Sequence, residues 1–363
     1  MKFKRFAAVT AALGVMVAGG IVASSANADV VSNSYVMVGS DTLQDAANAL
    51  ANGTTITGPR VRVTASGETI GSFNAFPSTG TGSMIQTKPT GPYFLRPSGS
   101  GNGVTALRAS ITGAAWNGAT ITGQIDIARS SSGAGSNANA DGKLAYIPFG
   151  RDAVAYIYTG GTSAWANLTP AQLKQVYEGT LTSIDGVAVT PRLPQVGSGT
   201  RSFFLSAIGS PALPAGFDSG NTTAENDATV LGANQIIPFS VASWTAQSTG
   251  AAPSTLGGAS VSLGSPVSGV APVSGAGTST VPNSAYYANT TFGRDTYLVV
   301  ERARITSGDA KYDPTLAALV NSSLGTSLTN FTATLSGSPR RVKEKFGFLA
   351  PSSTAPIYAF ATL

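Results

Sequence analysis

The stretch QVGSGTR at residues 195–201 decides the fold we expect, because it places a turn rich in glycine and hydroxyl groups between an extended segment and a helix. Two prolines in residues 187–194 disfavour a helix before the turn. Residues 202–208 have the apolar spacing of a helix, which stops at a glycine. The first N–H groups of a helix lack partners and the dipole is positive there, so the turn is a candidate oxyanion site. The alternative is that Ser198 or Thr200 only caps a surface helix.

Three other segments have the same character. GSDT at residues 39–42 separates a predicted strand from an amphipathic helix over residues 43–50. SGSGNG at residues 98–103 precedes a predicted helix, and RSSS at residues 129–132 follows a predicted strand over residues 124–128. Each segment also has an ordinary interpretation: a helix cap, a flexible loop and a solvated loop respectively. Their number favours a shared anion-binding role.

The N-terminus predicts export. Residues 1–5 carry three cations, residues 6–22 are apolar, and ANA at residues 26–28 fits a small-residue cleavage site, so we predict a signal peptide over residues 1–28. A membrane anchor is the alternative, which the glycines in the apolar run disfavour. Cleavage would leave 19 basic and 17 acidic residues, a net charge of +2. We therefore expect no broad basic surface and no nucleic-acid partner.

Composition argues against an enzyme. The 363 residues suffice for two domains, yet they include neither cysteine nor histidine. Disulfides, a cysteine nucleophile and a serine–histidine hydrolase are thereby excluded, and structural zinc is disfavoured. A hydrolase with another base remains an alternative, but no Ser-x-x-Lys motif is evident. We expect no catalytic residues, no metal and no cofactor.

A repeated tetrapeptide suggests how two lobes are joined. FGRD occurs at residues 149–152 and again at residues 292–295, and an apolar β run follows each copy. We expect two paired strands that cross between the lobes. Between them, residues 168–177 predict a helix with Thr169 as N-cap and Pro170 at its first position.

The remaining pattern alternates helices with short apolar strands, which indicates an α/β protein. Residues 247–284 are rich in Gly, Ser, Pro and Ala and predict either a disordered linker or a hairpin around residues 259–263. Further strands are expected at residues 34–38, 60–65 and 236–242, and further helices at residues 314–320 and 341–346.

Taken in order, these motifs resemble the phosphate-binding proteins of bacterial phosphate ABC transporters, which are two-lobed solute-binding proteins of the type II periplasmic class. The most specific pair is LTPAQL…VYEG within residues 168–179 and GSGTR at residues 197–201. The resemblance implies an α/β, periplasmic-binding-protein-like fold of two α/β lobes joined by two crossing strands. Residues 29–150 and 296–363 would form the first lobe, and residues 151–295 the second.

The resemblance also implies a ligand site in the cleft between the lobes. Phosphate would lie there without its water shell, held by backbone N–H groups at helix N-termini, by hydroxyl groups and by an arginine. Carried onto this sequence, the candidate ligand residues are Ser40, Asp41, Thr42, Ser98, Ser100, Arg129, Ser130, Ser131, Ser198, Gly199, Thr200 and Arg201.

Two departures from the family pattern bear on the ligand. Ser131 stands where some relatives have an aspartate that accepts a proton from phosphate, and Asp41 or Asp152 is a possible substitute. Relatives often carry an arginine four residues before the serine of the GSGT turn, where this chain has Pro194. Arg192 lies nearby, but we expect Arg129 and Arg201 to supply the positive charge.

The function implied by the resemblance is capture of inorganic phosphate, or a related oxyanion, for uptake by an ABC transporter permease. The protein would be secreted or periplasmic and monomeric. The alternative is a secreted surface or matrix protein that keeps the binding-protein fold without a transport role, since a fold alone does not fix a function.

Overall fold

The computed structural model describes residues 31–52, 68–77, 84–257 and 260–363. Within these residues a mixed sheet runs through the whole molecule, in the order β11-β12-β8-β16-β7-β1-β2, with β13 and β17 also paired to β8. Its strands are β1 (Tyr35–Gly39), β2 (Ile70–Ser72), β7 (Ile127–Ser130), β8 (Leu144–Thr159), β11 (Thr190–Pro191), β12 (Gln235–Ser240), β13 (Val261–Gly264), β16 (Gly293–Glu301) and β17 (Ile357–Ala359).

The smaller elements lie around this sheet. The short two-stranded pairs are β3 (Met84–Ile85) with β4 (Phe94–Leu95), β5 (Ala115–Trp116) with β6 (Ala119–Thr120), β9 (Ser183–Ile184) with β10 (Val187–Ala188), and β14 (Val273–Ser274) with β15 (Val281–Pro282). The helices are α1 (Gln44–Asn52), α2 (Ser100–Thr112), α3 (Pro170–Glu178), α4 (Gly199–Ala207), α5 (Val241–Thr249), α6 (Ser284–Tyr287), α7 (Arg302–Ile305), α8 (Pro314–Leu319) and α9 (Pro339–Lys345). Single turns of 3-10 helix are η2 (Gly135–Asn137), η3 (Ser163–Asn167), η4 (Ala228–Val230) and η5 (Gly277–Ser279).

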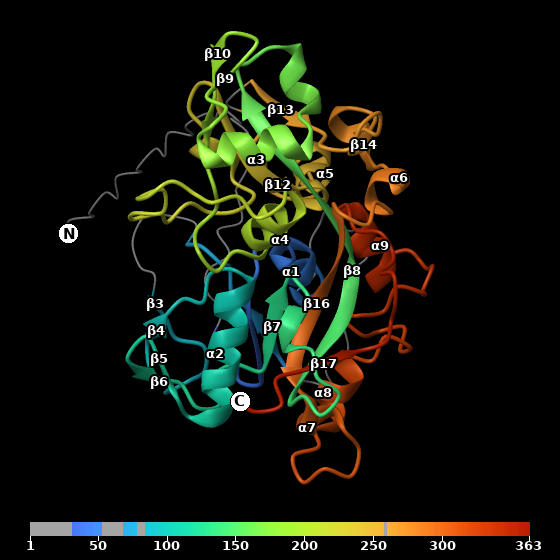
Figure 1. The fold of residues 1–363 in the computed structure, drawn as a ribbon. Coiled ribbons are helices and arrows are strands. Elements are labelled where there is room, and N and C mark those ends of the chain that lie inside the picture. Colours follow the sequence, from blue (N-terminus) through green and yellow to red (C-terminus); the bar gives the residue numbers. More distant parts are fainter. Residues whose placement is uncertain (1–30, 53–67, 78–83, 258–259) are drawn as a thin grey trace, which may run out of the picture.

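Strand β8 joins the two halves of the molecule (Figure 1). Its first residues pair with β16 and β17, and its last residues pair with β12 and β13. The sequence LAYIPFGRDAVAYIYT is almost continuously apolar, as expected of a strand covered on both faces, and every residue except Arg151 is buried. The expected pair of crossing strands is thus present as β8 and β16, although each FGRD motif lies within its strand or at its start instead of before it.

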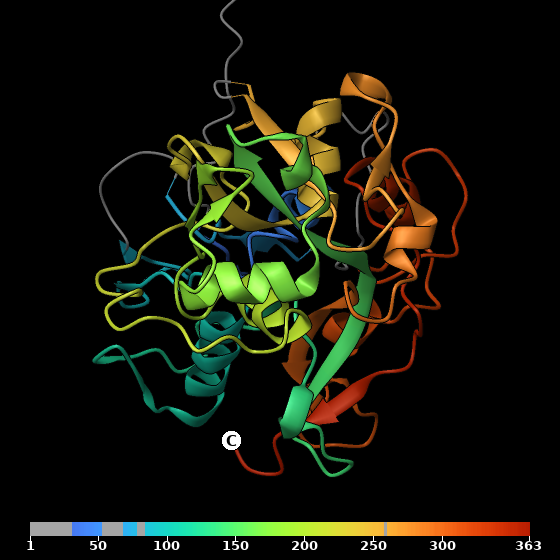
Figure 2. The same cartoon turned by 45° about the horizontal axis from the view of Figure 1, so that its top comes forward.

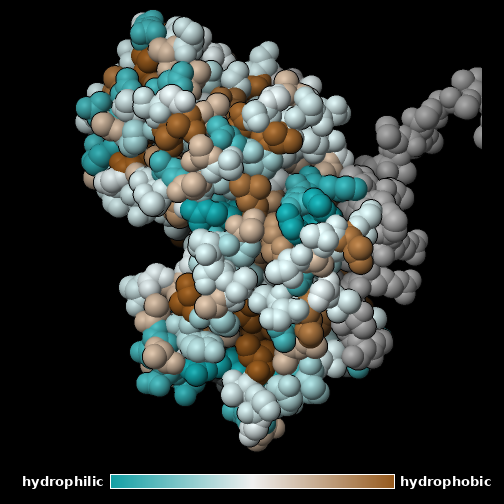
Figure 3. Space-filling model, turned by 90° about the vertical axis from the view of Figure 1, so that its right-hand side faces the viewer, coloured by the Kyte–Doolittle hydropathy of each residue, from teal (hydrophilic) through white to brown (hydrophobic). Residues whose placement is uncertain are grey.

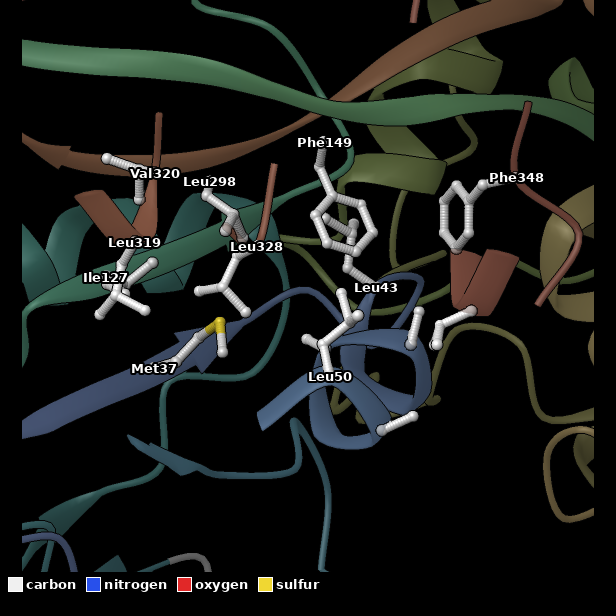
Figure 4. Packing of buried hydrophobic residues seen from close by; sticks show 14 of the residues in the cluster. Met37, Leu43, Leu50, Ile127, Phe149, Leu298, Leu319, Val320, Leu328 and Phe348 are labelled. Carbon is white, nitrogen blue, oxygen red and sulfur yellow. The ribbon is translucent and has the colours of Figure 1, made fainter. Parts of the chain in front are cut away.

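Apolar side chains pack in separate clusters on the two halves. We call the half built on β1, β2, β7 and the start of β8 the first lobe, and the half built on β11, β12, β13 and the end of β8 the second lobe. One cluster of the first lobe packs α1 and α8 against β1 and β16, with Met37, Leu50 and Leu298 at its centre (Figure 4). A cluster of the second lobe packs α3 and α4 against the end of β8, around Trp165 and Phe204. Each lobe therefore has a core of its own.

Local signals place the start of helix α3 correctly. Helix α3 begins after Thr169, whose side chain accepts from the backbone N–H of Gln172 in a capping box, and Pro170 is its first residue. Gly179 ends it in the left-handed conformation, with φ of 72°. The helices expected near residues 314–320 and 341–346 are confirmed as α8 and α9.

Several expected boundaries are corrected by the structure. Helix α4 already starts at Gly199 and α2 at Ser100, so the two glycine-rich turns form the first turns of the helices they precede. Strand β7 covers Ile127–Ser130, three residues later than predicted at its start, and Arg129 lies inside it. The expected strand at residues 236–242 ends at Ser240, where α5 begins.

Residues 247–284 contain ordered elements where the structure describes them. The alternation near residues 259–263 corresponds to β13, which pairs with β8 instead of forming a hairpin of its own. The strand expected at residues 60–65 and the signal peptide lie outside the described residues. In the described part of the chain, we find no helix of the length and apolar character needed to cross a membrane, and no grouping of side chains that could hold a metal ion.

Candidate anion-binding site

The N-terminus of α4 carries the first half of the candidate site. Ser198 caps the helix, and its Oγ accepts from the backbone N–H of Arg201. Ser198 and Thr200 are buried, with 1% and 0% of their surface exposed, although both side chains are hydrophilic. Buried hydroxyl groups need partners. Ser198 Oγ donates to Glu225, and Thr200 Oγ1 lies within hydrogen-bond distance of Thr42 Oγ1 in the first lobe.

The turn after β1 carries the second half. Gly39 has φ of +109°, and a side chain there would collide with the carbonyl oxygen of Arg129, so only glycine fits. The N–H of Ser40 donates to the same carbonyl at 3.0 Å, which fixes the turn against β7. Thr42 Oγ1 then lies 3.4 Å from Thr200 Oγ1. The two turns therefore meet, and we call the donors of Ser40, Thr42, Ser198 and Thr200 the cradle.

The cradle holds the carboxylate of Glu225. Oε1 accepts from Ser40 Oγ at 3.2 Å and from Thr42 Oγ1 at 3.4 Å. Oε2 accepts from the backbone N–H of Thr200 at 3.2 Å and from Ser198 Oγ. Glu225 is only 3% exposed. An anionic group with two oxygen atoms is thus bound by four donors, two from each lobe.

Arg294 brings positive charge to the cradle. Its Nη2 donates to Thr200 Oγ1 at 2.9 Å and approaches Thr42 Oγ1 at 3.5 Å. The same atom forms an ion pair with Asp152 Oδ2 at 2.9 Å, and both side chains are almost fully buried. Asp152 Oδ1 accepts from Ser240 Oγ and from the N–H of Ala242. Asp152 therefore holds the Nε and Nη2 atoms of Arg294, and Nη2 also contacts the cradle.

Two carboxyl groups at the cradle have opposite pKa shifts. Burial and the neighbouring Glu225 raise the pKa of Asp41 well above its usual range. Burial opposes ionisation of Glu225, but the neighbouring Asp41, a hydrogen bond from Ser198 and the charge of Arg294 hold its pKa below the ordinary value. Asp41 is consequently the protonated partner and Glu225 the charged one. Asp41 Oδ2 is buried without a hydrogen-bond partner among the described residues.

The comparisons with known proteins concern the fold that carries this site. Residues 32–210 match the model of the PBP superfamily domain. The match covers 179 of the 363 residues, just under half of the chain. No curated protein sequence matched the chain.

Solved structures extend the likeness beyond the matched PBP domain. An ABC-type phosphate transport receptor from Vibrio cholerae is 15% identical, with 87% of this chain and 100% of that chain covered and a TM-score of 0.50. A phosphate-binding protein from Stenotrophomonas maltophilia is 14% identical, with 89% and 91% covered and a TM-score of 0.49. At such identities the likeness concerns the fold alone. The likeness to the Vibrio cholerae receptor confirms the predicted two-lobed α/β fold.

Neither arginine that we expected at the site of this PBP fold points into the cradle. Arg129 is fully buried, and its guanidinium donates to the carbonyl groups of Ser40, Met37 and Phe73. It supports the backbone beneath the first turn. Arg201 pairs with Asp218 and donates to the carbonyl of Pro194. Both predictions followed from nearness in sequence, which does not fix the direction of a long side chain.

Arg192 does not supply the charge of the cradle either. Its Nη2 donates to Thr223 Oγ1 at 3.3 Å. The charge comes instead from Arg294, whose only sequence signal was the repeated FGRD motif. Glu225 gave no signal of its own, since it is one of several acidic residues in a polar loop. Asp41, Ser40, Thr42, Ser198 and Thr200 do come together as the sequence predicted.

The remaining serine candidates lie beside the cradle or apart from it. Ser100 Oγ and Ser131 Oγ are 3.1 Å apart and both face Gly199 across the cleft. Ser98 Oγ accepts from Gln195 Nε2 at 2.8 Å. Ser130 Oγ donates to the carbonyl of Ser132 at 2.7 Å. Ser100, Ser131 and Gly199 therefore border the cradle, whereas Ser98 contacts Gln195 of the second lobe and Ser130 is engaged locally.

A cavity adjoins the cradle. It has a volume of about 430 Å³, and Asp41, Thr42 and Glu225 line it together with side chains of α1 and α5. The surface between the two lobes is also indented (Figure 3). Figure 2 shows the ribbon of the same two halves from another side. The cradle thus lies at the junction of the lobes with free volume next to it, as expected for a ligand that is enclosed between them.

Proposed function

We propose that this protein is a solute-binding protein that captures inorganic phosphate, or a related tetrahedral oxyanion, in the cradle. The observation that carries the proposal is that the four cradle donors, two from each lobe, already bind two oxygen atoms of a buried anionic group. Hydroxyl groups and a helix N-terminus provide the hydrogen bonds that such an anion requires. Arg294 supplies the opposite charge without leaving Asp152.

Closure of the two lobes is the proposed mechanism. Ser40 and Thr42 belong to the first lobe, and Ser198 and Thr200 to the second, so an anion completes all its contacts only when the lobes meet. A ligand shifts such an equilibrium by binding the closed state better than the open one. The strands β8 and β16, which connect the lobes, are where the bending would occur. No bond to the ligand is made or broken, in keeping with a superfamily of binding proteins.

The wider setting is proposed from the predicted signal peptide and from the fold. The neighbour from Vibrio cholerae is described as a transport receptor, and we propose that this protein likewise delivers its ligand to an ABC transporter permease. It would act outside the cytoplasm, as a monomer. Residues 29–150 with 296–363, and residues 151–295, are the proposed lobes.

A second candidate is a secreted surface or matrix protein that keeps the fold without transport. The presence of Glu225 in the cradle favours it, because a carboxylate of the chain itself already satisfies the donors. In that case no added oxyanion would bind.

Calorimetric titration of the phosphate-free protein tests the two candidates. Phosphate and then sulfate are titrated at about pH 5.5 and about pH 8, so that both charge states of phosphate are sampled. We expect saturable binding of phosphate. Thr42→Val should weaken it by about tenfold or more, since a hydrogen bond to a charged group contributes about 1.5–3 kcal/mol.

Thr112→Val is the matched control, because Thr112 is exposed at the far end of α2. Its affinity should equal that of the wild type. If neither the wild type nor a Glu225→Ala variant binds phosphate or sulfate, the transport function is rejected and the second candidate remains.

A further inference from the structure

Glu225 occupies the atoms that a bound oxyanion would need. Its carboxylate takes both hydroxyl groups of the first lobe, the Ser198 hydroxyl and the N–H of Thr200. These are the same four donors that the proposed function assigns to phosphate. Two anions cannot share them, because each donor has one hydrogen to give and like charges repel at this distance.

Hydrogen bonds and a nearby positive charge compensate for the burial of the Glu225 carboxylate. Leaving a charged carboxylate without partners inside a protein costs several kcal/mol. Here both oxygen atoms have two donors, and Arg294 lies beside the same hydroxyl groups. The protein therefore presents a complete binding site to its own side chain.

The backbone that carries Glu225 is anchored independently of the carboxylate. The next residue, Asn226, donates to Asp41 Oδ1 and Thr42 Oγ1 at 3.2 Å each. Its Oδ1 accepts from the N–H of Ser240, and its carbonyl accepts from Gln247 Nε2 at 2.8 Å. Because the neighbouring residue is fixed, the Glu225 side chain can turn without unfolding of the loop.

There is also room for the side chain to leave. The cavity of about 430 Å³ next to the cradle is lined by Glu225 itself. A rotation about the side-chain bonds of Glu225 would carry the carboxylate from the cradle toward this volume. Gln247 and Ser243 on α5 also line the cavity and offer polar contacts there.

We propose that the Glu225 carboxylate is a resident internal ligand of the cradle, which holds the lobes closed without a solute, and that the incoming oxyanion binds by displacing it into the adjacent cavity. This inference rests on the proposed function. Its consequence is an exchange of one anion for another. The free energy of phosphate binding is then the difference between the free energies with which phosphate and Glu225 bind the same donors.

The first test compares phosphate affinities by calorimetry. Glu225→Ala removes the internal competitor and should bind phosphate at least about tenfold more tightly than the wild type. Glu225→Gln retains the size of the side chain but not its charge, and should also gain affinity. Asp227→Asn is the control, because Asp227 lines the same cavity without touching the cradle and reports the general effect of removing a negative charge.

The proposal is supported if phosphate affinity increases more in Glu225→Ala and Glu225→Gln than in Asp227→Asn. Equal or weaker binding by the Glu225 variants, with a wild type that does bind phosphate, overturns it while the transport function stands. Such a result would make Glu225 a helper of the ligand instead of its competitor.

A second test needs no ligand. Small-angle X-ray scattering of the phosphate-free wild type should show a closed particle whose radius of gyration does not change when phosphate is added. Glu225→Ala should be larger without phosphate and contract with it. If the phosphate-free wild type and Glu225→Ala give the same radius, the internal ligand does not hold the lobes together and the proposal is rejected, whether or not phosphate binds.

Discussion

Arg294 and Asp152 lie opposite each other on the crossing strands β16 and β8, with Nη2 of the arginine 2.9 Å from Oδ2 of the aspartate. The next pair in the ladder, Asp295 and Arg151, is the reverse combination, at 3.1 Å. The repeated FGRD motif explains both pairs. When two copies of Arg-Asp run antiparallel in this register, each arginine faces the aspartate of the other copy. Successive residues point to opposite faces of a sheet, so only Arg294 reaches the cradle.

The first prediction compares these two ion pairs. Arg294→Gln leaves Asp152 charged and buried, and loss of one partner of a buried pair costs about 3–5 kcal/mol. Arg151→Gln should cost clearly less, because this pair is less deeply buried: 19% and 8% of the Arg151 and Asp295 side chains are exposed, against 3% and 0% for Arg294 and Asp152. Urea denaturation of both variants gives the two free energies of unfolding. Equal losses would contradict the distinction that we draw between the two faces.

A second prediction concerns the contact between the lobes at Gly199. A Cβ atom at this position would lie closer to Ser100 Oγ and Ser131 Oγ than Cβ atoms are found in proteins. Gly199→Ala should therefore keep the lobes apart, increase the radius of gyration and weaken phosphate binding by about tenfold or more. Gly257→Ala is the control, since an added Cβ there meets no atom within 4 Å. Unchanged affinity in Gly199→Ala would show that the lobes need not close as tightly as in this structure.

The third prediction is a pH dependence from Asp41. Its pKa is raised in the folded protein by burial and by Glu225, whereas an unfolded aspartate titrates near 3.9. Above about pH 4 the folded state therefore binds more protons than the unfolded state, and stability falls as pH rises. Asp41→Asn mimics the protonated form. The free energy of unfolding of the wild type, minus that of Asp41→Asn, should decrease between about pH 4 and pH 8. A difference that does not depend on pH would mean that Asp41 is ionised in the folded protein.

Lys343 provides the fourth prediction, with the opposite sign. Burial lowers the pKa of its amine well below the usual range. Nζ donates to the carbonyl groups of Phe149 and Leu328 at 2.8 and 3.2 Å, and no carboxylate pairs with it among the described residues. An unfolded lysine keeps its proton up to about pH 10.4, so the unfolded state binds more protons and stability rises with pH up to that value.

Lys343→Met keeps the length of this side chain without its charge. The wild-type free energy of unfolding, relative to that of Lys343→Met, should increase from about pH 7 to about pH 10. Urea denaturation at three pH values measures the difference. Parallel pH profiles for the two proteins would rule out a neutral buried amine.

Much of the fold was determined by short-range signals in the sequence. The capping box at Thr169 and Gln172 involves neighbouring residues only, so it could be identified without the fold. The same holds for Ser198, whose hydroxyl caps the helix that begins one residue later. Apolar runs predicted β8 and β16, and the repeated motif predicted that they pair. The hydroxyl groups of the cradle were found because they lie at strand and helix ends, where side chains of a small polar residue have little freedom.

Which charged residues lie at the site was decided only by the tertiary structure. Glu225 reaches Ser40 and Thr42 over a separation of more than 180 residues, and no local pattern records such a contact. Arg129 lies next to the predicted turn in sequence, yet its long side chain is drawn beneath the backbone because the carbonyl groups of the first lobe need donors there. A long charged side chain adopts the direction in which it can pair with a buried hydrogen-bonding group. The position of that group depends on how the two lobes pack.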